Sequence, residues 1–168
     1  MDYEIRKGVH VVPSKKTTGK WLDDWLEGLR LGPSTMASYR KNVRLHVTPH
    51  IGQPPLDKLT ETDITRVYRK LEGGGRQDHK AGSPLSARTI RYCHTILKAA
   101  LREAVNQGLI AVNPADKAKP PAAKEAKAPE IYPWTAEQLA TWHAWVEQHQ
   151  CPDAVAWCVL AYTGARRG

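Results

Sequence analysis

The sequence predicts an all-α protein, and three observations support this fold class. Apolar residues recur every three or four positions in several segments, glycine and proline separate those segments, and serine or threonine stands where a helix would begin. The chain has 168 residues, enough for one domain and part of another. Only at the N-terminus, where Val9 and Val11 follow Gly8, does alternation indicate a short strand.

The first two helices are bounded by clear start and stop signals. The first begins after the cap candidates Thr17 and Thr18 and ends at Gly32. Its expected inward residues are Trp21, Leu22, Trp25, Leu26 and Leu29. The second begins at Ser34 and is expected to stop near Pro49, because proline lacks a backbone donor and clashes with the preceding turn. Its apolar residues are Met36, Tyr39 and Val43.

The third and fourth helices carry the strongest local signals. Thr60 and Asp63 have the spacing of a capping box, and the residues expected to face inward after it are Ile64, Val67, Tyr68 and Leu71. Residues 73–84 contain three consecutive glycines and indicate an exposed loop. Ser86 is expected to cap the longest helix, which Gly108 closes. Its inward stripe is Ile90, Cys93, Leu97, Leu101 and Ala104.

The C-terminal third predicts a linker and two more helices. Residues 115–128 are rich in alanine, lysine and proline without an apolar period, which is typical of an interdomain linker, and we expect this linker to span 115–133. A helix is expected from Thr135, with Leu139, Trp142 and Val146 inward. Every residue of 154–162 is apolar or aromatic, which suits a helix that is buried on all sides inside a larger domain. Because this sequence offers no covering for it, we expect 134–168 to be loosely packed, partly disordered or buried against another copy.

Positive charge is concentrated in two segments. The formal net charge is +8. Residues 34–50 carry three bases and no acid, and residues 85–114 carry four bases and one acid. In the second segment Arg88, Arg91, Thr95, Lys98 and Arg102 are spaced three or four residues apart. Such spacing forms one basic ridge on a helix, which favours a nucleic-acid partner over a merely solvated face.

Several other chemistries are disfavoured by the residues present. Cys93, Cys151 and Cys158 form no CxxC pair, so neither a disulfide framework nor a zinc site is indicated. His46 and His50 have metal-ligand spacing, but a third ligand is missing and Pro49 lies between them. No signal peptide or long apolar segment is present. We therefore expect a soluble cytoplasmic protein without a metal, a cofactor or a small-molecule substrate.

The order of these elements resembles a phage-type tyrosine recombinase, or phage integrase. The resemblance runs from about Thr18 to Gly168. It rests on a tryptophan-rich helix, a helix with Ser34-x-x-x-x-Tyr39, the Gly52 turn, the Leu59-Thr60 helix and the long basic helix. Then follow Asn113-Pro114, the linker, Thr135-x-Glu137-Gln138 and finally Thr163-Gly164-Ala165-Arg166.

The resemblance implies a domain order and a partner. Residues 18–114 would be a SAM-like core-binding bundle of four or five short helices, residues 115–133 a linker, and 134–168 the first helices of a truncated catalytic domain. Residues 1–17 would follow an upstream arm-type DNA-binding domain. The implied partner is double-stranded DNA at a recombination or attachment site, on which the parent enzyme assembles as a tetramer in a prokaryotic cell, associated with the nucleoid.

The resemblance also implies roles for individual residues. Those expected to contact DNA are Thr35, Arg40, Lys41, Arg44, Arg88, Arg91 and Lys98. For Tyr39, core packing is favoured over DNA contact. Arg166 matches the family's first catalytic arginine, whose guanidinium would hold the scissile phosphate. The parent would cut and rejoin DNA through a 3′-phosphotyrosine, without metal or nucleotide. This chain lacks the nucleophilic tyrosine, so we expect it to bind DNA without cutting it.

Two alternatives remain open from the sequence. The chain could be a regulatory DNA-binding protein derived from a truncated integrase, which the reading frame beyond Gly168 would distinguish. It could also be a helical protein-interaction module whose basic ridge meets an acidic partner. Charge reversal of Arg88 and Arg91 would then weaken a protein complex and leave DNA binding unaffected.

Overall fold

The computed structural model describes residues 16–76, 80–128 and 130–165. Contacts divide the chain into two units, Met1–Lys127 and Ala128–Gly168. In the described residues the structure is helical and contains no strand, only an isolated bridge between Thr17 and Pro55. The all-α prediction is therefore confirmed. The strand predicted around Gly8 lies outside the described residues.

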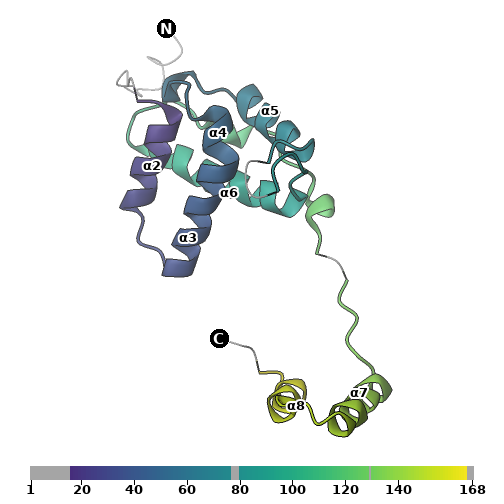
Figure 1. Ribbon diagram of the computed structural model, residues 1–168. Coiled ribbons are helices and arrows are strands. Elements are labelled where there is room, and N and C mark those ends of the chain that lie inside the picture. The colour runs from purple at the N-terminus through teal and green to yellow at the C-terminus, as the bar shows by residue number, and fades with distance from the viewer. Residues whose placement is uncertain (1–15, 77–79, 129, 166–168) are drawn as a thin grey trace. The chain divides into compact units, whose positions relative to one another are not determined.

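The first unit is a bundle of helices in which α6 crosses behind α3 and α4 (Figure 1). Its α-helices are α2 (Thr18–Gly28), α3 (Pro33–Asn42), α4 (Thr48–Ile51), α5 (Glu61–Glu72) and α6 (Ala87–Asn106). Shorter elements join or follow them: the π-helical η1 (Val43–Val47) and the 3-10 turns η2 (Leu56–Lys58), η3 (Pro114–Asp116) and η4 (Ala123–Ala126).

Helix α2 begins where the sequence predicts and ends earlier. The Thr17 side chain accepts a hydrogen bond from the backbone N–H of Lys20 and so caps the first turn. The helix stops at Gly28, because Leu29 already has extended backbone angles, whereas the sequence predicted an end at Gly32. Glycine is an unfavourable helix residue, which accounts for the earlier stop.

The second helical segment ends at Ile51, two residues past Pro49 and close to the predicted stop, but the proline itself lies inside the helix. Helices α3, η1 and α4 form one continuous run through Pro49 to Ile51. Within it, the backbone N–H of Thr48 bonds the Val43 carbonyl, five residues back, as in a π-helix. We attribute the tolerance of Pro49 to this wider turn, which loosens the backbone where the proline ring would clash.

Helix α5 confirms the predicted capping box. The Thr60 hydroxyl accepts from the Asp63 N–H at 3.2 Å, and the Asp63 carboxylate accepts from the Thr60 N–H at 3.2 Å. The connection to α6 returns to the core at Leu85, which is buried and donates its N–H to the Leu71 carbonyl. Residues 77–79 of the predicted loop lie outside the described residues.

Helix α6 forms the centre of the core. Ser86 caps it as predicted, accepting from the Thr89 N–H. The predicted inward stripe is confirmed, because Ile90, Cys93, Leu97, Leu101 and Ala104 are all buried. The Trp21 indole N–H donates to the Ala100 carbonyl at 3.1 Å, which ties α2 to the middle of α6.

Residues 113–121, which we call the strap, pack on the helices instead of forming a free linker. Ala115 is fully buried and Ala118 is 8% exposed. The backbone N–H of Lys119 donates to the Thr65 hydroxyl of α5 at 3.1 Å. The predicted linker lacks an apolar period because single alanines and a proline, rather than a helical face, make these contacts. The helical unit accordingly extends to Lys127.

Replacing Asn113 by alanine is expected to destabilise the strap. This side chain is 6% exposed, donates to the Lys98 carbonyl at 3.0 Å and accepts from the Ala115 N–H at 2.9 Å. Losing both bonds in a buried position should lower the free energy of unfolding by about 1–3 kcal/mol. Urea denaturation followed by circular dichroism measures it. A change below about 0.5 kcal/mol would mean that the strap is only loosely held.

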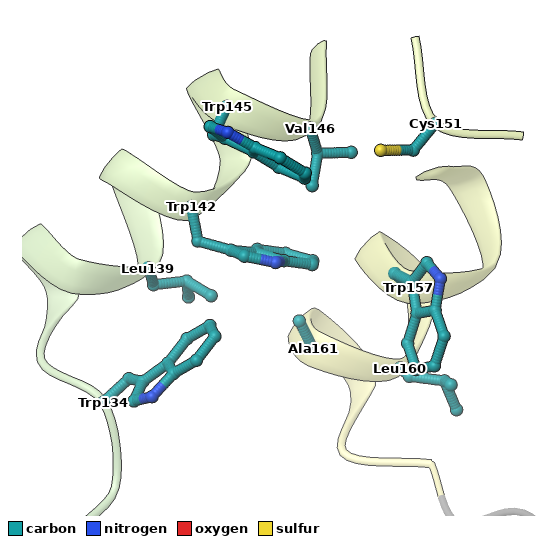
Figure 2. Close-up of a pocket in the computed structure, with 9 residues that line it drawn as sticks. All are labelled: Trp134, Leu139, Trp142, Trp145, Val146, Cys151, Trp157, Leu160 and Ala161. Carbon is teal, nitrogen blue, oxygen red and sulfur yellow. The ribbon is translucent and has the colours of Figure 1, made fainter. Parts of the chain in front are cut away.

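The second unit contains two helices, α7 (Ala136–Gln148) and α8 (Ala154–Thr163). The capping box of Thr135 and Gln138 is present as predicted. Helix α8 has no buried residue, and Val155 is 78% exposed and Trp157 54% exposed. The two helices line an apolar pocket of about 580 Å³ that is open to solvent. In it, the ring of Trp142 points from α7 toward Ala161 of α8 (Figure 2). An all-apolar helix is thus largely exposed, as the prediction of loose packing implies.

Candidate nucleic-acid interface

The predicted basic ridge lies on the face of α6 that points away from the core. Arg88, Thr95 and Arg102 are exposed, and Arg91 and Lys98 are partly buried. The spacing explains this placement, since these positions are about half a helical turn from the buried Cys93 and Leu97. The helix therefore presents cations over most of its length.

The strap contacts two of the ridge cations. The Arg91 guanidinium donates to the Pro121 carbonyl at 2.8 Å, and the Lys98 ammonium lies 2.9 Å from an Asp116 carboxylate oxygen. In the described part of the chain, no ion pair is found for Arg88 or Arg102. The ridge is therefore divided into two engaged and two available cations, a division that sequence reasoning did not anticipate.

Two of the cations predicted to contact DNA, Arg40 of α3 and Arg44 of η1, lie in a groove against α2. Thr35, Arg40, Lys41 and Arg44 are all exposed. Arg40 and Arg44 line a groove together with Asp23, Leu26 and Glu27 of α2. The structure thus brings Arg40 and Arg44 together, but beside α2 acids and not beside the cations of α6. Tyr39 is partly buried between Trp25 and Tyr92, with ring centroids 6.3 Å and 5.9 Å away, so it serves packing.

A further group of cations lies where the strap meets α5, and sequence reasoning missed it. Arg66, Arg69, Lys117 and Lys119 line one groove with Glu61, Thr62 and Thr65. Two of these cations are already paired within α5, Arg66 with Asp63 at 2.9 Å and Arg69 with Glu72 at 2.7 Å. The lysine-rich composition of the predicted linker was the only available signal.

The charges of the ridge act on a partly buried histidine, His94, which lies on the same helix. Burial lowers the pKa of His94, and the nearby charges of Lys98 and Arg91 lower it further, while Asp116 opposes them. Burial raises the pKa of Tyr68, whose hydroxyl lies 2.9 Å from the His94 Nδ1. Both shifts favour the uncharged forms of the two side chains, and the neutral phenol and imidazole can share one hydrogen bond. His94 is a structural histidine beside the ridge.

The turn that precedes Arg166 is formed by glycine. Gly164 has a φ of +65°, a left-handed conformation that favours glycine, and its N–H donates to the Leu160 carbonyl at 3.1 Å. The Thr163 hydroxyl accepts from the Ala165 N–H. Arg166 itself lies outside the described residues, so its predicted role stays a prediction.

Other kinds of site find no support in the described part of the chain. No cluster of three or more histidine, cysteine or acidic side chains there could hold a metal ion. Burial raises the pKa of the Cys93 thiol to about 12, so this thiol is protonated and unreactive at neutral pH. No described helix combines the length and the apolar character that a membrane crossing needs.

The helical bundle and its family match define a SAM-like domain. Residues 17–71 match the model described as phage integrase, N-terminal SAM-like domain. The solution structure of the phage integrase SAM-like domain from Moorella thermoacetica is 40% identical, with a TM-score of 0.51. The match covers 67% of this chain and 91% of that one. No curated protein sequence matches.

The chain belongs to the phage integrase family of tyrosine recombinases. Two further structures share the fold at lower identity. A fragment from Clostridium leptum is 19% identical over 70% of this chain and 96% of its own, with a TM-score of 0.51. A lambda integrase dimer bound to a COC′ core site is 18% identical, with a TM-score of 0.68 over 99% of this chain and 43% of that one. The predicted family is thus confirmed.

Proposed function

We propose that the first unit binds double-stranded DNA, as the core-binding part of a site-specific recombinase. The observation that carries this proposal is the α6 ridge, where Arg88 and Arg102 are exposed and have no ion pair among the described residues. Fourteen residues of helix span roughly 21 Å, or about six base pairs, so these two cations can reach separate phosphates. The lambda integrase structure, which contains a core site, supports the same assignment.

The exposed basic side chains form two groups with different tasks. Cations of α6 neutralise phosphates and fix the register of the protein on the duplex. Thr35, Arg40, Lys41 and Arg44 form a second basic surface, where an arginine fork suits the O6 and N7 atoms of guanine. Asp23 and Glu27 lie in the same groove as Arg40 and Arg44 and limit how strongly that surface attracts phosphate without base contacts.

The second unit is assigned by the same proposal to the start of a catalytic domain. Its Thr-Gly-x-Arg turn would place Arg166 beside the scissile phosphate, where two N–H groups stabilise charge on the nonbridging oxygens. The parent reaction would then be strand exchange through a 3′-phosphotyrosine within a tetramer on DNA. No metal or cofactor takes part in this scheme.

The proposal predicts strongly salt-dependent binding. The full chain should bind a labelled duplex of about 30 base pairs at 50 mM salt. Affinity should fall roughly 100-fold by 200 mM salt if four phosphates are neutralised. Fluorescence anisotropy measures both values, with the attachment-site core of the encoding element compared against a scrambled duplex. Absence of binding at 50 mM salt, or affinity that does not respond to salt, would reject the proposal.

A further inference from the structure

The beginning of the strap is firmly attached beside Lys98. The Asn113 amide donates to the backbone carbonyl of Lys98 itself, and its oxygen accepts from the Ala115 N–H. Ala115 is fully buried, and the Asp116 N–H donates to the Asn113 carbonyl at 3.2 Å. These contacts hold the backbone of Asp116 beside the ridge.

The pair that results is reachable from solvent. The Lys98 and Asp116 side chains are 36% and 50% exposed, and their charged atoms are 2.9 Å apart. A phosphate approaching Lys98 must therefore displace the Asp116 carboxylate or share the ammonium with it, and it meets a like charge in either case. Two like charges this close repel each other even in a watery environment, so the carboxylate weakens phosphate binding at Lys98.

We propose that Asp116 is a built-in competitor of DNA, occupying Lys98 in the free protein and lowering its affinity for phosphate. This inference rests on the proposed DNA-binding function and adds a regulatory element to the same surface. The strap thereby lowers the affinity of the ridge for DNA, because a phosphate can bind the Lys98 ammonium only by displacing the Asp116 carboxylate or sharing the ammonium with it. Arg88 and Arg102, which have no acidic partner among the described residues, make the first contacts.

If Asp116 competes with DNA for Lys98, the variant Asp116→Asn should bind DNA more tightly than the wild type. We expect roughly three- to tenfold tighter binding at 50 mM salt, because the substitution removes one exposed ion pair and one like-charge repulsion, and both are weak in water. The slope of log affinity against log salt should steepen by about 0.9, because one more phosphate is neutralised. Anisotropy titrations at four salt concentrations measure both quantities.

The matched control is Asp57→Asn. Asp57 lies in the 3-10 turn η2, is paired with Lys58 at 4.0 Å, and undergoes the same change of charge. This control should bind within twofold of the wild type. A second test compares Lys98→Gln with Lys98→Gln/Asp116→Asn. If Asp116 acts through Lys98, adding Asp116→Asn to Lys98→Gln should increase DNA affinity less than it does in the wild type. Thermal unfolding of each variant shows whether the strap remains in place.

The outcomes separate the two proposals. If the wild type does not bind DNA at 50 mM salt, both the proposed function and the proposal that Asp116 competes with DNA fail. If the wild type binds but Asp116→Asn is no tighter than Asp57→Asn, only the competitor fails. Weaker binding by Asp116→Asn would instead show that Asp116 orients Lys98 for DNA, and would also overturn the competitor.

Discussion

Replacing Trp21 by alanine is expected to lower the free energy of unfolding by about 3–5 kcal/mol. Trp21 is 3% exposed, and its indole N–H bonds the Ala100 carbonyl across the core. The substitution removes the hydrogen bond that joins α2 to α6 and the buried indole that packs in the core, and the cavity that is left adds to the loss. Because small domains are stable by only about 5–15 kcal/mol, much of the first unit should unfold at 37 °C. Urea denaturation monitored by far-ultraviolet circular dichroism gives the value.

The control for Trp21 is the same substitution at Trp134. That side chain is 61% exposed and belongs to the second unit, so its removal should cost about 0.5 kcal/mol or less. Equal losses from the two variants would show that the Trp21 contacts do not carry the stability assigned to them.

Reversing the charge of Arg88 and Arg102 together is expected to weaken DNA binding roughly 100-fold at 50 mM salt. Each reversal removes a phosphate contact and adds a repulsion, and each is assigned about 1.4 kcal/mol, a factor of ten in affinity. The salt dependence should also become shallower by about two neutralised phosphates. Both side chains are exposed, so the fold should be retained. Anisotropy titration of Arg88→Glu/Arg102→Glu against the wild type measures the loss.

The comparison for this variant is Lys20→Glu/Lys58→Glu. These side chains are 70% and 75% exposed, lie on α2 and in η2, and undergo the same total change of charge. Their reversal should weaken binding less than tenfold, through the net charge alone. A loss as large as that of the ridge variant would mean that binding depends on overall charge and not on the α6 surface.

Most of the fold could be predicted because its signals are local. The capping boxes at Thr60 and Thr135 depend on residues three positions apart, and the buried stripe of α6 depends on helical spacing. Pro49 shows the limit of such rules. Its usual effect is to end a helix, but a π-helical turn just before it lets the helix continue to Ile51.

The candidate site could be predicted only in part. The ridge cations share one face of α6 because of their spacing, and the family assignment follows from ordered motifs. Whether each cation is available depends on segments far away in the chain. Arg91 meets the Pro121 carbonyl and Lys98 meets Asp116, and neither contact leaves a periodic pattern.

By itself, the sequence determined the helices, the core stripe, the excess of positive charge on α6 and the integrase family, because these depend on short-range spacing and composition. Only the tertiary structure decided that residues 113–121 pack on the helices, that Asp116 neutralises part of the ridge, and that Arg40 and Arg44 lie beside α2 acids. These outcomes depend on which distant charges meet, and a charge acts through distances in space and not through positions along the chain.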